Sequence, residues 1–292
     1  MTILLFLFVS LIAVQAQAEG NFEQPLKNVE YITVAILAKD KAHTLPLYLS
    51  CIENQTWPAS KTYLYIRTNN NNDETAEILQ AWTEKVADRY AGVYFDDNDI
   101  VEQVQRFGQH EWNHERLKVI GRLRQESINF AIKYNTHYFV ADCDNFIQPH
   151  TIESLFDTHC PIVAPLLHTG TNVYSNYHAA IDEYGYLEDC PHYYTLWNRE
   201  LAGMIQVPVV HCTYLVRNEV LDKVRYDDES GRFEYVIFSD TARKLGIPQY
   251  LDTRDMYGRI SFAESSEEFF NEPWLFEFVD SSGLDLLKNY CK

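Results

Sequence analysis

The first half of the chain alternates between stretches typical of buried strands and stretches typical of amphipathic helices, at a spacing of about thirty residues. The strands are predicted at 31–38, 62–68, 93–95 and 138–141, and the helices at 45–54, 74–89 and 115–134. Strands that follow one another through helical crossovers lie parallel, because the crossover returns the chain to the same end of the sheet. The pattern therefore predicts an α/β fold with a mostly parallel central sheet.

The second half does not continue this alternation. Residues 160–167, 171–177 and 207–216 favour β structure and are separated by many turn residues, which predicts a mixed, partly antiparallel region that completes the same sheet. The tail from Ala263 is rich in aromatic residues and is expected to pack back on the domain as a helix. We thus predict a leader at 1–18, one domain at 19–262 and a C-terminal tail at 263–292.

The N-terminus predicts the compartment. Residues 3–14 form an apolar stretch of signal-peptide length, and Ala16-Gln17-Ala18 is a small-x-small cleavage site. We expect the mature chain in the secretory pathway, either in the endoplasmic reticulum lumen or secreted, without stable membrane insertion after cleavage. Six cysteines suit an oxidising compartment and predict one or two disulfides.

The formal net charge of −18 argues against a nucleic-acid or anionic-membrane partner, because both would repel the chain. An acidic surface suits a basic acceptor chain instead.

Two polar segments follow predicted strands at the same edge of the sheet. Asp142 and Asp144 come directly after the strand at 138–141, and residues 69–73 follow the strand at 62–68. Ligands of open parallel sheets bind beyond the carboxyl ends of the strands. This edge is therefore the predicted site.

Two carboxylates in so small a volume repel each other unless a positive charge lies between them. Carboxylate oxygens are hard ligands that suit Mn²⁺ or Mg²⁺, so Asp142 and Asp144 are metal-ligand candidates, with a turn acid and a helix cap as the alternative. A phosphotransferase of the haloacid dehalogenase type also uses an Asp-x-Asp motif. In that class the motif follows the first strand, and Thr or Val stands two residues after the second Asp. In this chain the motif comes late and that position is Phe146, so we set that class aside.

Six ordered stretches carry a resemblance: "LAKDKAHTLPLYLSCIE", "TNNNNDET", "ADCDNFI", "VAPLL", "YSNY" and "VPVVHCTYLV". From about Thr33 to about Glu268 the chain resembles the N-terminal glycosyltransferase domain of the procollagen galactosyltransferases and the cerebral endothelial cell adhesion molecule. The resemblance implies a GT-A-type nucleotide-diphospho-sugar transferase fold, a UDP-sugar donor, and Mn²⁺ or Mg²⁺.

The resemblance also implies roles for individual residues. Asp142 and Asp144 would hold the metal that bridges the UDP diphosphate, with His211 as third ligand. The residues implied to bind the UDP-sugar are Ala38, Lys39, His43, Asn69, Asn72, Asp73, Asp142, Cys143 and Asp144.

An inverting transferase needs a base for the acceptor hydroxyl. Glu234 and Asp240 are the candidates, and the sequence does not separate them from each other or from ordinary solvated acids of a surface helix. A platform for the acceptor is a further hypothesis, from residues whose aromatic faces or amide would contact a sugar: Tyr174, Asn176, Tyr193, Tyr194 and Trp197.

The sequence hypothesis is therefore a metal-dependent, secretory-pathway hexosyltransferase. It would transfer galactose from a UDP-sugar to a protein hydroxyl, such as a collagen-type hydroxylysine. The alternative, suggested by the family's adhesion-molecule member, is a catalytically inactive glycosyltransferase-like binding or adhesion protein. A nucleotidyltransferase is weaker, because "LAKDKAHT" lacks the glycine expected of a triphosphate loop.

Overall fold

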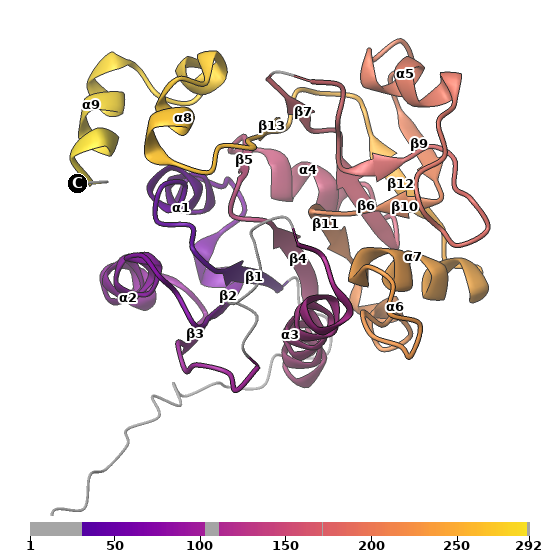
Figure 1. Ribbon diagram of the computed structural model, residues 1–292, viewed down its shortest axis with the longest axis horizontal. Coiled ribbons are helices and arrows are strands. Elements are labelled where there is room, and N and C mark those ends of the chain that lie inside the picture. The colour runs from indigo at the N-terminus through magenta and orange to yellow at the C-terminus, as the bar shows by residue number, and fades with distance from the viewer. Residues whose placement is uncertain (1–30, 103–110, 171, 291–292) are drawn as a thin grey trace, which may run out of the picture.

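The computed structural model describes residues 31–102, 111–170 and 172–290, so the predicted leader lies outside the described residues. An eight-stranded sheet in the order β3-β2-β1-β4-β11-β6-β12-β9 forms its centre (Figure 1). Its strands are β1 (Ile32–Ala38), β2 (Thr62–Thr68), β3 (Gly92–Asp96), β4 (His137–Ala141), β6 (Ile162–Pro165), β9 (Met204–Val207), β11 (Thr213–Val216) and β12 (Gln249–Asp252).

The N-terminal half of this sheet is parallel, as the sequence predicted. β1 pairs in parallel with β2 and with β4, and β2 pairs in parallel with β3. The second half is mixed: β11 runs antiparallel between β4 and β6, whereas β12 pairs in parallel with β6. The predicted fold class, a mostly parallel sheet completed by a mixed region, is therefore confirmed.

Helices cover both faces of the sheet. Apolar side chains of α1 (Leu45–Glu53), α2 (Thr75–Val86) and α4 (Thr151–Asp157) form one core with the strands. The opposite core includes α3 (His114–Lys133), α5 (Pro191–Trp197), α6 (Asn218–Leu221) and α7 (Glu234–Lys244). Strand β1 supplies Ile32, Val34 and Ile36 to the first core and Ala35 to the second, because successive strand side chains point to opposite faces.

Short elements complete the structure. A three-stranded sheet joins β5 (Asn145–Ile147), β13 (Gly258–Ile260) and β7 (His168–Thr169), and β8 (Tyr177–His178) pairs with β10 (Val209–Val210). Short 3₁₀ helices form at η1 (Ala59–Lys61), at η2 (Ala87–Arg89), which continues α2, and at η4 (Pro273–Glu277).

The segment predicted as one β run at 207–216 is interrupted. Cys212 has φ +60°, a left-handed conformation that an extended strand does not contain. The chain therefore leaves β10, turns at Cys212, and enters β11 in the main sheet. This break places residues 211–212 beside the end of β4, where the Asp142 N–H donates to the Cys212 carbonyl at 3.0 Å.

The C-terminal segment contains two α-helices, whereas the sequence predicted one helix. Helices α8 (Ser266–Phe270) and α9 (Ser281–Tyr290) flank η4 and lie near α1 (Figure 1). Phe269, Trp274 and Leu275 are buried in the core on the α1 side of the sheet. The boundary between a 19–262 domain and its tail remains a prediction.

The expected disulfides do not form within the described residues. Cys51, Cys143, Cys160, Cys190 and Cys212 are all free thiols, and Cys291 lies outside the described part of the chain. Within the described part of the chain, no helix is both long enough and apolar enough to cross a bilayer.

Trp274 should hold the tail against the core. Its ring packs on Phe146 of β5 and on Phe269, and its indole N–H donates to Glu272 at 2.6 Å. Trp274→Ala should lower the free energy of unfolding by about 3–5 kcal/mol, since it leaves a large cavity. Phe276→Ala, on the exposed side of the same 3₁₀ helix, should change it by less than about 0.5 kcal/mol. Urea titrations measure both, and equal losses would contradict the packing role.

Candidate functional site

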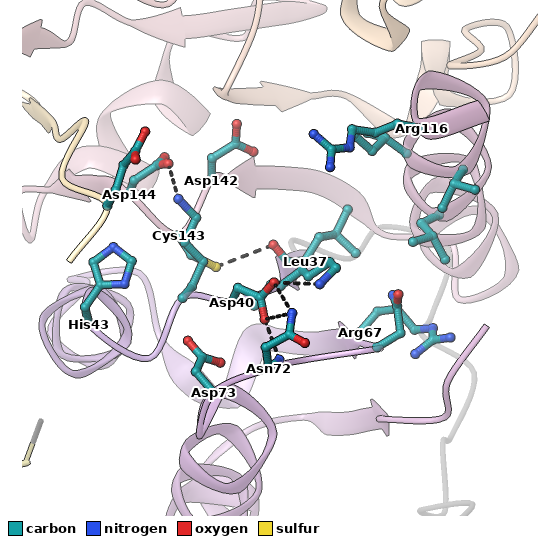
Figure 2. A pocket seen from close by; sticks show the side chains of 18 of the residues that line it. Leu37, Asp40, His43, Arg67, Asn72, Asp73, Arg116, Asp142, Cys143 and Asp144 are labelled. Atoms are coloured by element: carbon teal, nitrogen blue, oxygen red, sulfur yellow. Dashed lines mark hydrogen bonds and ion pairs between the residues drawn. The ribbon is translucent and has the colours of Figure 1, made fainter. Parts of the chain in front are cut away.

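The turn between β4 and β5 carries Asp142, Cys143 and Asp144, and neighbouring elements fix its backbone. The Tyr48 hydroxyl of α1 donates to the Ala141 carbonyl at 2.9 Å, and the Ser261 N–H donates to the Asp144 carbonyl at 2.9 Å. Together with the bond from Asp142 to Cys212, these contacts hold the turn from three directions. Both carboxylates border the same cavity (Figure 2).

Each carboxylate of this turn is paired with a cation from another element. Lys41 Nζ, in the loop between β1 and α1, lies 2.8 Å from Asp144 Oδ2. Arg124 Nη2, on α3, lies 2.6 Å from Asp142 Oδ1. Burial alone would lower the pKa of Lys41. The Asp144 carboxylate more than offsets this effect, so the pKa of Lys41 is raised. Two fixed cations therefore reduce the repulsion between the two acids.

The loops after β1 and β2 are joined to each other. Asp73 accepts from the Ala42 N–H at 2.9 Å and from the Thr75 N–H at 3.1 Å. Asp40 accepts from the Asn72 N–H at 2.6 Å. Asp40 and Asn70 both adopt positive φ, which bends the two loops toward each other over the ends of their strands.

A cavity of about 800 Å³ lies over these loops and the turn after β4, within the range of about 300–1,000 Å³ typical of ligand sites. All nine residues that the sequence assigned to UDP-sugar binding line it. They are Ala38, Lys39, His43, Asn69, Asn72, Asp73, Asp142, Cys143 and Asp144. The segments after β1, β2 and β4 thus meet in one space, as the rule for the carboxyl ends of parallel strands predicts. Their binding role remains a prediction.

Sequence reasoning missed cavity residues in three regions: the ends of β1 and β2 with the loop after β1, helix α3 with the segment before it, and the segment after β13. The missed residues are Leu37, Asp40, Lys41, Arg67, Trp112, Arg116, Val119, Ile120, Leu123, Arg124, Ser261, Phe262, Ala263 and Glu264. One signal was present: Arg124 falls within the buried stripe of its helix, where a charged residue needs a partner. The position of residues 261–264 had no such signal, because pairing of β13 with β5 and β7 places them there.

The charges around the cavity balance, although the whole chain is strongly acidic. Five basic side chains line it, namely Lys39, Lys41, Arg67, Arg116 and Arg124. Five acidic side chains line it as well, namely Asp40, Asp73, Asp142, Asp144 and Glu264. The cavity therefore repels an anionic ligand less than the net charge of −18 of the whole chain would suggest.

His211 lies behind the turn rather than on the cavity wall. Its ring is almost fully buried between Tyr235 at 4.9 Å and His178 at 5.4 Å, and its Nδ1 is 2.9 Å from Cys212 Sγ. Burial lowers the pKa of His211, which favours the neutral imidazole that binds metals. Its role as third ligand remains a prediction.

The donor set at the turn fits a hard divalent cation. Across residues 31–102, 111–170 and 172–290, no group of three or more His, Cys, Asp and Glu side chains is already arranged as a metal site. Asp142 and Asp144 nevertheless present carboxylate oxygens to the cavity. That chemistry suits Mn²⁺ or Mg²⁺, which are typically bound through one or two carboxylates with substrate phosphates as further ligands.

The two base candidates occupy different environments. Glu234 begins α7, is 7% exposed, and has Oε1 at 3.2 Å from Arg124 Nε. Burial raises the pKa of Glu234, and Arg124 opposes part of this rise. Glu234 and Asp142 therefore contact the same guanidinium, that of Arg124. Neither base candidate lines the cavity.

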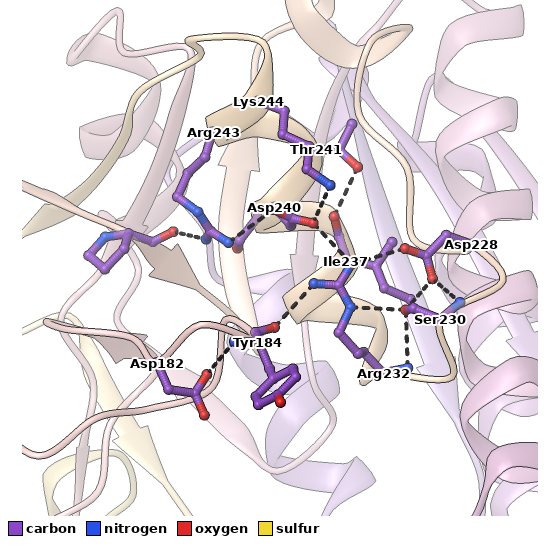
Figure 3. A network of polar contacts seen from close by, with 12 residues as sticks. Asp182, Tyr184, Asp228, Ser230, Arg232, Ile237, Asp240, Thr241, Arg243 and Lys244 are labelled. Carbon is purple, nitrogen blue, oxygen red and sulfur yellow. Dashed lines mark hydrogen bonds and ion pairs between the residues drawn. The ribbon is translucent and has the colours of Figure 1, made fainter.

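Asp240 belongs to a separate network on the exposed side of α7 (Figure 3). Its carboxylate contacts Arg232 at 3.0 Å, Lys244 at 2.9 Å and Arg243 at 3.4 Å. Burial raises the pKa of Asp240, but hydrogen bonds from Lys244 and Arg232 outweigh it, so the pKa is lowered below the ordinary 3.8. These contacts indicate a structural role for Asp240.

The residues suggested as an acceptor platform do not form one surface. Asn176 and Tyr193 are buried, whereas Tyr194 is exposed on α5. The half-exposed aromatic side chains that line the cavity are instead Trp112 and Phe262, and Tyr174 packs edge-on against Phe262 at 5.1 Å.

Comparison with solved structures confirms the architecture as a GT-A-type glycosyltransferase fold. S. aureus TarS superposes with a TM-score of 0.50 at 12% identity, covering 89% of this chain and 70% of that chain. The mannosyltransferase PcManGT from Pyrobaculum calidifontis, in complex with GDP-Man and Mn²⁺, gives 0.50 at 15% identity, covering 81% and 58%. At such low sequence identity, the structural similarity establishes the fold alone.

The chain belongs to glycosyltransferase family 25, since the model of that family's N-terminal domain matches residues 29–273. It is 32% identical to human procollagen galactosyltransferase 2 over 81% of this chain, and 30% identical to human inactive glycosyltransferase 25 family member 3 over 86%. The matches cover 39% and 43% of those relatives, so the chain spans about two fifths of their length.

The Asp240 network should stabilise the fold in a pH-dependent way. Folding lowers the pKa of Asp240 below its ordinary value of 3.8. The contribution of the network to the free energy of unfolding is therefore fully present at pH values above 3.8, and it is lost as the pH falls through the lower pKa of the folded state. Asp240→Asn should cost about 1 kcal/mol of unfolding free energy at pH 7.

The difference between wild type and Asp240→Asn should stay constant from pH 7 to about pH 4.5 and then shrink. Urea titration at each pH measures it. Glu229→Gln, which removes one negative charge from an exposed site nearby, is the matched control. A difference that grows as the pH falls would contradict the stated direction of the pKa shift.

Proposed function

We propose that this chain is a metal-dependent glycosyltransferase domain. It would transfer a hexose, galactose, from a UDP-sugar to a hydroxyl group of a protein acceptor such as a collagen-type hydroxylysine. The observation that carries the proposal is the cavity, which is lined by all nine residues assigned to the donor from sequence, Asp142 and Asp144 among them. Family membership and the GT-A fold support the reaction class. The similarity to a procollagen galactosyltransferase supports the sugar and the acceptor.

Asp142 and Asp144 would hold Mn²⁺ or Mg²⁺, with His211 as the candidate third ligand. When bound, the metal would offset the negative charge that develops on the UDP leaving group. Lys41 already lies at Asp144, and the Lys39 ammonium donates to the Asn70 carbonyl at 2.7 Å beside the same cavity. These two ammonium groups are positioned to lower the electrostatic cost of bringing a diphosphate to the cavity.

Glu234 is the proposed base, because it lies next to the Asp142–Arg124 pair, whereas Asp240 is engaged by three cations elsewhere on α7. In an inverting transfer the acceptor oxygen bonds to the anomeric carbon as the bond to the UDP oxygen breaks. The hydroxyl proton passes to the Glu234 carboxylate, and UDP leaves as the anion. A buried carboxyl whose pKa is raised is a stronger base than an exposed one.

The second candidate function is a glycosyltransferase-like binding or adhesion protein without turnover. Two observations favour it. One relative at 30% identity carries the name inactive glycosyltransferase 25 family member 3, and in this chain both acids of the Asp-x-Asp motif are occupied by ion pairs. The predicted compartment, the secretory pathway, suits either function.

Calorimetric titration with UDP tests the donor site. UDP should bind in the presence of Mn²⁺, and Asp142→Asn/Asp144→Asn should weaken this binding at least about tenfold, the lower end of the loss seen when support of a metal ligand is removed. Asp157→Asn, an exposed acid of α4, should bind UDP like wild type. If UDP does not bind with any divalent metal, the transferase proposal fails and the binding protein takes its place.

Substitution of each acid distinguishes the base. Glu234→Gln should lower kcat for transfer to a hydroxylysine peptide by about 10²–10⁴-fold with UDP affinity unchanged, whereas Asp240→Asn should transfer at the wild-type rate. Radiolabelled galactose incorporation and calorimetry give the two quantities. A parallel loss of UDP affinity in Glu234→Gln would show that this carboxylate supports the donor site instead.

A further inference from the structure

The segment that joins α1 to β2 carries an acceptor sequence for N-linked glycosylation. Asn54-Gln55-Thr56 has the form Asn-x-Ser/Thr in which x is not proline. Asn54 caps the C-terminal end of α1, and both Asn54 and Thr56 are exposed to solvent. A glycan needs such exposure because it is bulky and strongly hydrated. The folded chain can therefore carry a glycan at Asn54.

This acceptor sequence lies at the edge of the sheet away from the cavity. Strands β1 and β2 are parallel, and the residues that follow them line the cavity. The connection that enters β2 at Thr62 therefore lies at the opposite, amino ends of these strands. Helix α1 begins just after His43, which lines the cavity, and its nine residues carry the chain about 13 Å away. A glycan on Asn54 would leave the approach to the cavity free.

The end of α1 tolerates a new bond at the Asn54 amide. Its Nδ2 donates to Ser50 Oγ at 3.2 Å, and this contact is exposed. A glycosylated amide nitrogen keeps one hydrogen, so the contact with Ser50 can persist after modification. The backbone N–H of Asn54 donates to the Ser50 carbonyl at 3.0 Å and is not involved in the reaction. Attachment of a glycan therefore leaves the hydrogen bonds that end the helix in place.

Folding ties the other two residues of the acceptor sequence to a later segment. The Thr56 hydroxyl donates to Glu153 Oε2 at 2.5 Å, and the Thr56 N–H donates to the Pro149 carbonyl at 2.7 Å. The Gln55 side-chain amide donates to the Gln148 carbonyl at 2.9 Å. Glu153 follows Thr56 by 97 residues, so the Thr56 hydroxyl is free until this later segment has been synthesised and has docked.

We propose that Asn54 is N-glycosylated, and that the glycan is attached during synthesis, before the segment with Pro149 and Glu153 docks on the acceptor sequence. The bond between C1 of an oligosaccharide and the phosphate oxygen of its lipid-diphosphate carrier breaks, and that carbon bonds to Asn54 Nδ2. The amide gives one proton to a base of the transferring enzyme, and the lipid diphosphate leaves as the anion. This inference goes beyond the proposed function and rests on the predicted secretory compartment.

Expression of the full chain with its own N-terminus in cultured animal cells tests the site. Peptide N-glycosidase should increase the electrophoretic mobility of wild type and convert residue 54 to aspartate, which peptide mass spectrometry detects. Asn54→Gln and Thr56→Ala should lose this mobility shift, whereas Thr56→Ser, which keeps the hydroxyl, should retain it. Asn129→Gln is the matched control, because Asn129 is exposed on α3 and is followed by Phe130 and Ala131, which make no acceptor sequence.

Cell-free translation separates attachment during synthesis from attachment to the folded chain. Wild type translated in the presence of microsomes should gain the glycan. The folded full chain, purified from bacteria without a glycan, should remain unmodified when it is added to detergent-solubilised microsomes from the same preparation. Equal modification of the folded chain would overturn the proposed order of glycan attachment and docking.

Failure of this inference is distinguishable from failure of the proposed function. If wild type from animal cells carries no glycan, or if Asn54→Gln keeps the mobility shift, only the assignment to Asn54 is overturned. Asn54→Gln should bind UDP with Mn²⁺ as tightly as glycosylated wild type, because the glycan lies away from the cavity. If neither protein binds UDP with any divalent metal, the proposed function fails, while the mobility shift still decides whether Asn54 is glycosylated.

Discussion

The site depends on compensation of the two carboxylates at the end of β4. Arg124 lies against Asp142 and Lys41 lies against Asp144, so each carboxylate has a positive charge beside it that reduces the repulsion between the two. These cations come from α3 and from the loop between β1 and α1, so the charge balance requires the β2-β1-β4 strand order that brings both beside the turn. A bound divalent ion would join an arrangement in which the acids are already fixed.

The loops around the cavity are held by side chains that accept backbone hydrogen bonds rather than by regular structure. Asp73 and Asp40 tie the loop after β1 to the loop after β2. Each of these two loops contains a residue with left-handed backbone, Asp40 in the first and Asn70 in the second. Such conformations persist only where the surroundings enforce them, and they concentrate at functional sites. The site is therefore preorganised, which reduces the entropy lost when a ligand binds.

Glu234 and Asp240 show why spacing alone could not separate the base candidates. Six residues apart on one helix, they lie roughly 120° apart around its axis, so that each meets a different environment. Glu234 faces the buried guanidinium of Arg124, whereas Asp240 meets Arg232, Arg243 and Lys244 near the surface. Burial raises the pKa of one carboxyl and hydrogen bonds from cations lower that of the other. Their helix position predicts neither outcome.

The pattern of residues along the chain predicts the parallel half of the sheet and the edge at which the site lies. Continuous apolar runs define β1, β2 and β4, and polar residues that follow such strands must share one edge, so all nine assigned donor residues line one cavity. The same pattern does not predict which other residues complete the site, because these come from segments distant in sequence. Lys41 and Arg124 find their acids 103 and 18 residues away in sequence, and residues 261–264 reach the cavity through pairing of β13. Local patterns record periodicity and burial, but contacts between distant segments follow from how the sheet and its connections fold together.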